Sequence, residues 1–488
     1  MSENKKPSLG KNFLMNSILT MSSFIFPLIT FPYVSRILLA EGNGKLQFAA
    51  SIVSYFIMIS QLGIPTYGIR ACAIVRDNRR ALSKTTHELL FISIGMSALA
   101  YAVFFLLLAH VPRMAQEKTL FLITSANILL TTISVEWLFK AMEQYTYITV
   151  RSLVFKVISV VAMFLLVQQK EDYEIYAAIS VFASSGSGIM NLTRLPKMID
   201  CKYLGSYDIK KHMKPVFVFF AMTCAATVYT NLDSVMLGFM ATDADVGYYA
   251  AAVKIKNILV SVVTALSTVL LPRVSYYYEQ KQLSEFWQVV SKAVRVVLLM
   301  AVPLCVYFML FARNGILFLS GPDYENAVAP MVAIMPTLIC IGLTSVLGIQ
   351  VLVPMGKEKA VLYSYILGAV VDCVANAVLI PHFQALGAAI GTLIAEAAVF
   401  AYQYVVLRKQ VSGYLKEARI PLLFLVSAVC AIMTGWMSKL PMGDFFILLI
   451  SAVCFFSIYL GLLHLGKESC LLELETIVLQ KIKKNKQK

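Results

Sequence analysis

Apolar residues dominate this chain in runs about as long as a membrane-spanning helix, and short polar joints separate the runs. A bilayer core of about 30 Å needs roughly 20 apolar residues for each helix. Only helices or closed barrels satisfy the backbone in lipid, and long runs without strict alternation favour helices. The pattern therefore predicts an all-α integral membrane protein.

The pattern divides into about fourteen transmembrane segments. In the first half they span residues 12–35, 46–64, 88–109, 120–139, 153–168 and 173–192. In the second half they span residues 215–241, 248–271, 294–310, 327–353, 360–380, 385–407, 420–437 and 445–464. An even number of segments predicts that both termini lie on one side of the membrane.

The distribution of Lys and Arg assigns that side, because basic residues in short joints resist translocation. Most of the 42 basic residues fall at the ends and in alternate joints, which we assign to the cytoplasm. Lys254 and Lys256 lie within a segment. The outer joints hold only seven basic residues: Arg36, Lys45, Arg113, Lys118, Lys170, Arg313 and Lys439. We therefore expect a multi-pass protein of the bacterial cytoplasmic membrane with both termini in the cytoplasm.

Composition agrees with this assignment. Charged residues make up 14% of the chain, against roughly 25% in soluble domains, and the mean hydropathy is +0.75. The topology accounts for the net charge of +15, so no nucleic-acid partner is needed, and the closing "KIKKNKQK" indicates a solvated tail near anionic lipid. The nine cysteines are scattered singly, which favours packing roles over metal binding. No soluble domain is inserted, which disfavours a membrane enzyme.

A weak internal repeat predicts two halves, as in many transporters. "GNGKLQFAASIV" at 42–53 resembles "DVGYYAAAVKIK" at 245–256, and each opens a segment after an outer joint. The repeat predicts one six-helix bundle in residues 1–200 and a second in residues 201–410. Two more helices and the basic cytoplasmic tail follow in residues 411–488.

Several stretches together resemble the Wzx-type polysaccharide flippases of the multidrug/oligosaccharidyl-lipid/polysaccharide (MOP) exporter superfamily. They are "SRILLAEGNGKLQFAASIVSYFIMISQLGIPTYGIRACAIVRD", "EWLFKAMEQYTYITVR", "LDSVMLGFM", "DVGYYAAAVKI", "LLPRVS" and "NAVLIPHFQALGAAIGTLIAE". The resemblance extends to about Arg408. It departs where family members often carry Asn and this chain has "VDCVAN", with Asp372 in that place.

The resemblance implies a flippase, not an enzyme, that moves oligosaccharide units on undecaprenyl pyrophosphate from the inner to the outer leaflet. No cofactor is implied beyond a coupling ion, Na⁺ or H⁺. Membrane lipid, a polysaccharide polymerase and glycosyltransferases are the expected partners. The alternatives are a MATE-like drug/cation antiporter and a lipid-linked sugar polymerase or ligase.

Counting about 1.5 Å per residue along each segment places several polar groups in the outer half of the membrane. They are Asp233, Lys254, Lys256, Asp372, Asn376 and Thr392, with Glu396 somewhat deeper. Asp372 and Asn376 are four residues apart and share a helix face, as do Thr392 and Glu396. Charges inside a membrane are costly, so they normally face a partner, an interior or water.

Two interpretations of this layer stay open. Carboxylates with Asn and Thr oxygens suit a hard cation or a proton, which makes Asp233, Asp372, Asn376 and Thr392 a candidate sodium site, with Glu396 as a further coupling residue. The resemblance supports it, because related lipid II flippases bind sodium through residues on helices 7, 11 and 12. Alternatively, Asp233 forms only a structural ion pair with Lys254.

The substrate's pyrophosphate requires cations, and the candidates are Arg36, Arg70, Lys254 and Lys256. Related lipid flippases use cavity arginines on helices 1, 2 and 8, which the resemblance carries to Arg36 directly. The alternatives are an Arg36 side chain that snorkels to the interface and an Arg70 that serves only as a topology signal.

Four charged residues surround the joint between the fourth and fifth segments. Glu136 and Glu143 lie near Lys140 and Arg151 in the sequence, so we expect local ion pairing there.

Overall fold

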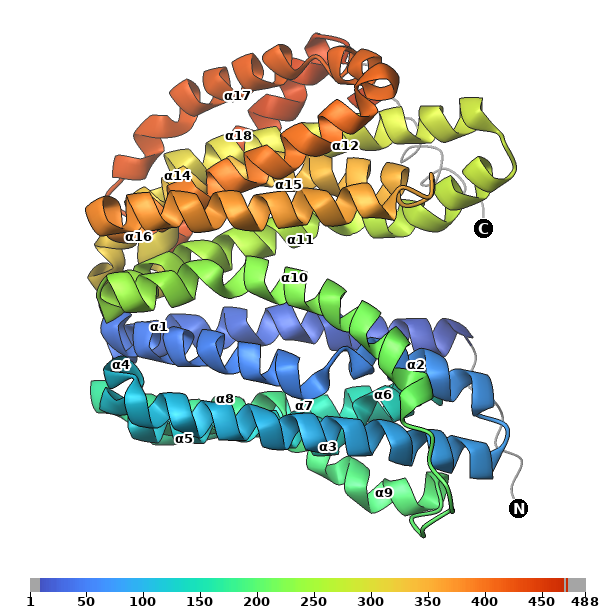
Figure 1. The fold of residues 1–488 in the computed structure, drawn as a ribbon. Coiled ribbons are helices and arrows are strands. Elements are labelled where there is room, and N and C mark those ends of the chain that lie inside the picture. Colours follow the sequence, from blue (N-terminus) through green and yellow to red (C-terminus); the bar gives the residue numbers. More distant parts are fainter. Residues whose placement is uncertain (1–8, 469–470, 473–488) are drawn as a thin grey trace, which may run out of the picture. The chain divides into compact units, whose positions relative to one another are not determined.

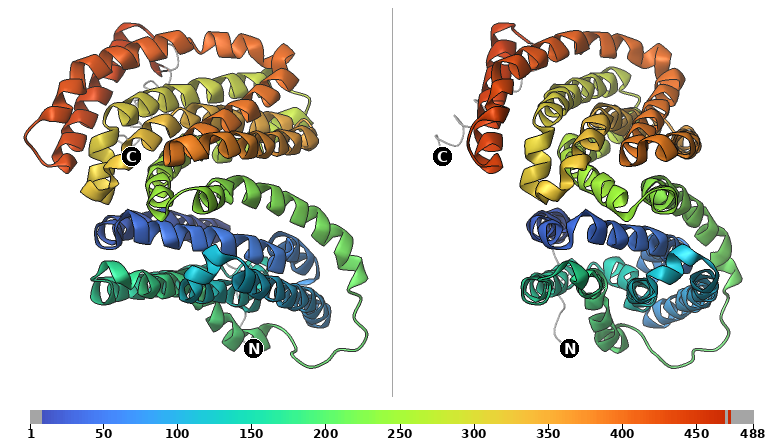
Figure 2. Two further views of the ribbon diagram at one scale, coloured as in Figure 1. Left: turned by 60° about the vertical axis from the view of Figure 1, so that its left-hand side comes forward. Right: turned by 90° about the vertical axis from the view of Figure 1, so that its left-hand side faces the viewer.

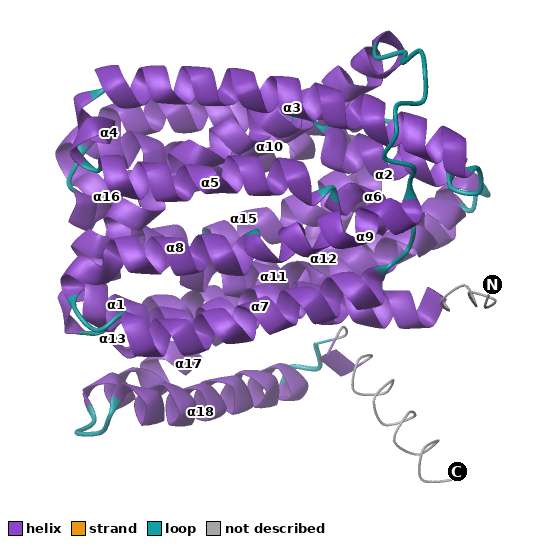
Figure 3. Ribbon diagram, turned by 90° about the horizontal axis from the view of Figure 1, so that it is seen from below, coloured by secondary structure: helices purple, strands orange, loops and turns teal. Residues whose placement is uncertain are grey.

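The fold was obtained as a computed structural model, which describes residues 9–468 and 471–472. The described residues form helices and connecting loops without a strand (Figure 1, Figure 3). The all-α membrane fold predicted from the sequence is confirmed. The first eight residues and most of the basic carboxyl-terminal tail lie outside the described residues.

The chain divides into two compact units, residues 1–247 and 248–488, and the division falls near the start of α11. The first unit contains α1 (Leu9–Gln61), α2 (Ile64–Val75), α3 (Arg79–His110), α4 (Pro112–Gln116), α5 (Lys118–Ser134), α6 (Glu136–Ala141), α7 (Tyr145–Leu166), η1 (Lys170–Asp172), α8 (Tyr173–Ser184), η2 (Gly186–Ile189), α9 (Met190–Met198) and α10 (Lys210–Met240). Figure 2 shows these helices from two further directions.

The second unit holds most of α11 (Asp243–Glu279) and the helices that follow. They are α12 (Leu283–Leu310), α13 (Ala312–Ser320), η3 (Pro322–Ala327), α14 (Val328–Ile334), α15 (Thr337–Thr344), η4 (Ser345–Leu352), α16 (Glu358–Glu417), α17 (Ile420–Thr434), η5 (Gly435–Lys439) and α18 (Asp444–Leu465). The predicted division at residues 200 and 410 was drawn from the internal repeat, and it stays a prediction.

Two helices are too long for a single crossing and each is broken by one residue. α1 has 53 residues and α16 has 60, whereas about 20 residues cross a bilayer. Leu39 in α1 and Gln384 in α16 have positive φ angles of 57° and 51°, which helical L-residues do not adopt. Each long helix is therefore two helices joined across a kink, and each contains two of the predicted segments.

The number of crossings was predicted as fourteen. In the described residues nine helices are long and apolar enough to cross a membrane, or up to eleven if each bent pair is one span. That count treats the two halves of α1 as one helix, likewise those of α16, and leaves the shorter apolar helix Lys118–Ser134 aside. All fourteen predicted segments fall on these helices, but the exact number of crossings stays a prediction.

Joints that were predicted to lie on one side of the membrane contact one another in the first unit. At the predicted outer side, Lys45 forms an ion pair with Glu117 at 2.8 Å, and Glu117 also accepts a hydrogen bond of 2.9 Å from Tyr173. Arg113 forms an ion pair with Asp243 nearby in the same unit. The alternation of joints along the first unit therefore agrees with the predicted map.

The predicted inner joints form a second group of contacts. Arg76 forms an ion pair with Glu143 at 2.8 Å, and Arg79 forms one with Asp200 at 2.8 Å. The hydrogen bond to Glu143 and its negative charge raise the pKa of the Arg76 guanidinium. Which of the two groups faces the cytoplasm stays a prediction.

The last two helices pack on α12 inside the second unit. Tyr307 of α12 donates a hydrogen bond of 2.8 Å to the carbonyl of Leu448, and Tyr459 donates one of 3.1 Å to the carbonyl of Leu299. Buried apolar side chains of α12, α17 and α18 form one core there. α17 and α18 are therefore an integral part of the second unit.

Candidate functional site

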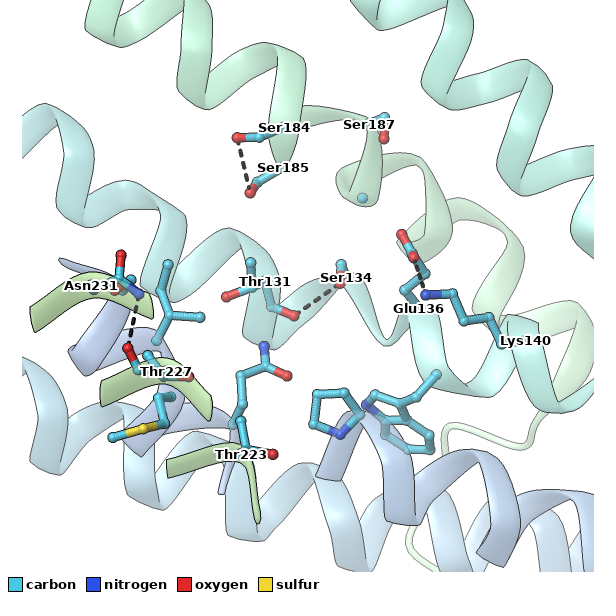
Figure 4. A pocket seen from close by; sticks show the side chains of 17 residues that line it. Thr131, Ser134, Glu136, Lys140, Ser184, Ser185, Ser187, Thr223, Thr227 and Asn231 are labelled. Atoms are coloured by element: carbon cyan, nitrogen blue, oxygen red, sulfur yellow. Dashed lines mark hydrogen bonds and ion pairs between the residues drawn. The ribbon is translucent and has the colours of Figure 1, made fainter. Parts of the chain in front are cut away.

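The first unit contains a polar cavity of about 530 Å³ inside an otherwise apolar helix bundle (Figure 4). α1, α5, α6 and α10 contribute to its lining, together with the junction of α8 and η2. Its polar lining residues are Ser54, Gln61, Thr131, Ser134, Glu136, Lys140, Ser184, Ser185, Ser187, Thr223, Thr227 and Asn231. We call it the hydroxyl cavity, because most of these groups are Ser or Thr.

Several of these side chains donate hydrogen bonds to carbonyl groups of their own helix, as Ser and Thr commonly do in membrane helices. Ser134 donates to the carbonyl of Thr131 at 2.9 Å, and Asn231 donates to the carbonyl of Thr227 at 3.0 Å (Figure 4). Each of these hydroxyl and amide oxygens retains a lone pair. The cavity can therefore exchange hydrogen bonds with a ligand rich in hydroxyl groups.

Glu136 begins α6 and joins two cations beside the cavity. Its carboxylate pairs with Lys140 at 2.9 Å and with Arg151 at 3.0 Å, and the Arg151 side chain is only 1% exposed. Arg151 also donates to Asn191. The predicted local pairing of Glu136 is confirmed, whereas Glu143 pairs with Arg76, the residue that follows α2. One carboxylate with two cations leaves this corner with a net positive charge.

A second cavity of about 460 Å³ adjoins the first and shares Glu136, Ser184 and Ser187 with it. We call it the lysine cavity after Lys156 of α7. The Lys156 ammonium donates to Ser22 at 2.8 Å and to Ser23 at 3.2 Å, and it lies 5.7 Å from the centre of the Phe26 ring. Among the described residues Lys156 forms no ion pair with a carboxylate.

Lys156 is a group that the sequence interpretation missed. It lies in the predicted segment 153–168, three residues from its start, and was not singled out there as a candidate. α7 begins at Tyr145, so Lys156 is about 16 Å along the helix and lies well inside it. Ser22 and Ser23, two adjacent hydroxyl residues in an apolar run, were the only hint of a polar partner. Nothing in the sequence places them opposite α7.

The two arginines predicted to bind substrate lie in the first unit but line neither cavity. Arg36 is exposed and donates to the carbonyl of Pro32 at 2.6 Å, one turn earlier in α1. Arg70 is exposed on α2. Both assignments stay predictions, and so do those of Lys254 and Lys256, which are half-buried on α11.

Four of the predicted ion-coupling residues lie on the two halves of α16 in the second unit. Asp372 and Asn376 precede its kink, Thr392 and Glu396 follow it, and all four are buried. Gly391 packs so closely against Asn376 that a side chain there would collide with the amide oxygen. The Asn376 face of one half is therefore packed directly against the other half, beside Thr392.

The sodium site that the sequence predicted stays a prediction. Thr392 is hydrogen-bonded to Tyr249 at 2.9 Å. Asp233 lies on α10, which belongs to the first unit. The described residues contain no cluster of three or more His, Cys, Asp or Glu that could hold a metal ion. Sodium binding at Asp233, Asp372, Asn376 and Thr392 would depend on amide and hydroxyl oxygens as well as carboxylates.

Long apolar helices that enclose polar, cationic cavities mark the protein as an all-α membrane transporter. Residues 9–278 match the model of a family described as "Polysaccharide biosynthesis protein", and residues 219–378 match the MatE family. Because the first match covers more than half of the sequence, the chain belongs to the polysaccharide biosynthesis protein family. The resemblance to Wzx-type flippases is confirmed at this level.

Curated relatives and solved structures agree with the family. The chain is 24% identical to a protein of Escherichia coli (strain K12) named "Putative O-antigen transporter", over 81% of this chain and 95% of that protein. A protein with the same name from Shigella dysenteriae is also 24% identical, over 81% of this chain and 98% of that protein. The fold is similar to that of the lipid II flippase MurJ in an inward closed conformation, with a TM-score of 0.71 and 17% identity over 92% of this chain and 97% of that one.

A second solved structure extends the similarity of fold. An inward-facing multidrug resistance MATE family transporter of the MOP superfamily matches with a TM-score of 0.59 and 12% identity, over 83% of this chain and 99% of that chain. Both solved structures are less than 25% identical in sequence to this chain, so the similarity concerns the fold alone.

Proposed function

We propose that this protein is a flippase that moves lipid-linked oligosaccharides across the bacterial cytoplasmic membrane for surface polysaccharide synthesis. The carrier lipid would be undecaprenyl pyrophosphate, and the protein would move the molecule without making or breaking a covalent bond. Its relatives named as O-antigen transporters, and the family to which it belongs, support this class of substrate.

The observation that carries the proposal is the pair of adjoining cavities in the first unit. Sugars offer many hydroxyl groups, and the hydroxyl cavity presents Ser, Thr, Asn and Gln side chains to them. A pyrophosphate offers negative charge, and Lys156 supplies a cation with no carboxylate partner among the described residues. In this account the sugars bind in the hydroxyl cavity and the pyrophosphate binds near Lys156.

Transport would proceed by alternating access, with the lipid tail remaining in the bilayer. We propose that an inward-moving cation or proton drives the return step through Asp233, Asp372, Asn376, Thr392 and Glu396. One charge moving inward supplies about 2.3 kcal/mol for each 100 mV of membrane potential. The test is export measured in cells at two sodium concentrations and two external pH values. Asp233→Asn is expected to abolish the ion dependence, and export that keeps its dependence in this variant would refute the coupling proposal.

Depletion of the protein in cells tests the transport proposal. Surface polysaccharide is expected to fall, and pyrophosphate-linked oligosaccharide is expected to accumulate in the membrane, since synthesis on the inner leaflet continues. Re-expression of the chain restores export. Unchanged surface polysaccharide with unchanged lipid-linked intermediates would contradict the proposal.

A drug/cation antiporter is the second candidate, because the MatE match and the MATE structure share this fold. Cationic drugs would require an unpaired carboxylate in the cavity. The carboxylate that lines both cavities, Glu136, is engaged with two cations. We therefore expect overexpression to leave resistance to cationic drugs unchanged, and a multi-drug resistance phenotype would favour the antiporter instead.

A further inference from the structure

A third cavity, of about 840 Å³, lies at one end of the second unit and has a basic lining. It is formed by the last part of α11, the first half of α12 and the last turns of α16. Its lining residues are Arg273, Leu283, Ser284, Trp287, Gln288, Val289, Ser291, Lys292, Arg295 and Tyr414. Three of these residues are cations and none is acidic.

The spacing along α12 explains why the polar groups meet. Ser284, Gln288, Lys292 and Arg295 recur at intervals of four, four and three residues, which places them on one face of the helix. The opposite side of α12 carries apolar residues that pack in the core of the second unit. The cavity is therefore a consequence of an amphipathic start to an otherwise apolar helix.

The two arginines have no acidic partner in the described part of the chain. Arg273 donates through Nε and Nη2 to the hydroxyl of Tyr277, at 3.1 and 3.0 Å. The Nε of Arg295 is buried and has no hydrogen-bond partner among the described residues. A buried guanidinium donor without a partner is unusual, and a bound anion would satisfy it.

The level of the cavity matches that of lipid phosphates. Twenty residues counted back from Leu310, the end of α12, reach residue 291, so Arg295 lies within about 6 Å of the expected edge of the hydrocarbon. Trp287 and Tyr414 stack at 5.8 Å with an angle of 18° between their rings. Tryptophan and tyrosine are enriched at this interface.

We propose that this cavity binds the phosphate group of an anionic membrane lipid. The arginines would bind the phosphate oxygens, and the stacked rings would lie beside the glycerol and the upper acyl chains. Basic pockets between helix ends are a known way for membrane proteins to hold anionic lipids. This site lies outside the cavities proposed for transport, and its occupancy does not depend on the identity of the transported substrate.

The experiment titrates the detergent-purified full-length protein with phosphatidylglycerol and measures its thermal stability at each lipid concentration. Phosphatidylcholine serves as the lipid without net charge, and inorganic pyrophosphate without lipid serves as the soluble anion. Wild-type protein is expected to be stabilised by phosphatidylglycerol more than by either control. Arg273→Gln and Arg295→Gln are each expected to weaken the apparent affinity for phosphatidylglycerol about tenfold, as the loss of a charged hydrogen bond predicts.

Lys409→Gln is the matched control, because Lys409 is an exposed cation near the same end of α16 but does not line the cavity. Its affinity for phosphatidylglycerol should equal that of the wild type. Arg273 is exposed, so its variant tests the site even if Arg295→Gln fails to fold. Unchanged affinity in the arginine variants would overturn the proposal. The proposal would also be overturned if pyrophosphate alone gave the full thermal stabilisation and phosphatidylglycerol added nothing to it.

Discussion

The ion-pair network around Glu136 allows a stability prediction with a built-in control. Glu136→Gln keeps the size and hydrogen-bonding shape of the side chain but removes its charge. Arg151, 1% exposed, then loses its carboxylate and keeps Asn191, a neutral amide. The Nε of Arg151 is already buried without a partner among the described residues. The substitution therefore leaves a buried cation with no compensating charge.

The magnitude follows from burial. Breaking a fully buried ion pair costs about 3–5 kcal/mol. The Glu136 side chain is 36% exposed and Lys140 can turn to water, so screening reduces the expected loss to about 2 kcal/mol. At about 2 °C for each kcal/mol in a large domain, the apparent Tm is expected to fall by about 4 °C.

The assay is thermal unfolding of the purified protein in one detergent at one scan rate, because membrane proteins commonly unfold irreversibly. Glu143→Gln is the matched control. Glu143 forms an ion pair of 2.8 Å with Arg76, but both side chains are about one-third exposed. Because water screens this pair, Glu143→Gln should leave Tm nearly unaltered. A Glu143→Gln variant that loses as much stability as Glu136→Gln would refute the argument from burial.

Two further predictions concern packing and charge. A side chain on Gly68 would lie 2.8 Å from the buried ring of Trp137, so Gly68→Ala is expected to cost about 1–3 kcal/mol, whereas Gly95→Ala, in open space, should not destabilise. Equal thermal stability of the two variants would contradict this. Lys156→Met is expected to lower polysaccharide export at least about tenfold while Lys156→Arg retains most of it. Full export by Lys156→Met, at equal protein levels in the membrane, would remove Lys156 from the substrate site.

The sequence was sufficient for the class of fold because membrane helices are specified by local composition. Segment length and the positive charge of joints depend on neighbouring residues alone, and the contacts of Lys45 with Glu117 and of Arg76 with Glu143 agree with the predicted alternation. Gly44 and Gly247, the two glycines of the proposed repeat, contact each other's neighbouring backbone. Their matching positions in the sequence did not show that they meet.

The candidate site was less predictable, because it depends on which helix faces which. Depth counting ranked charges by position along a helix, and so selected Asp233 and Lys254 in long apolar runs. Lys156 was passed over because it lies three residues from the start of its predicted segment, although α7 begins eight residues before that segment, at Tyr145. Its serine partners lie 133 and 134 residues away in the sequence. No periodicity or spacing encodes a contact of that kind.

Reconstitution tests the central claim most directly. Purified protein in liposomes that carry a fluorescent undecaprenyl-pyrophosphate oligosaccharide in one leaflet should expose that lipid to a membrane-impermeant quencher or sugar-specific probe on the other side. Our account predicts transfer of this lipid by wild-type protein, no transfer in protein-free liposomes, and much slower transfer by Lys156→Met. Lipid-linked oligosaccharide that stays in its leaflet in the presence of folded wild-type protein, with a driving ion gradient of either sodium or protons, would contradict it.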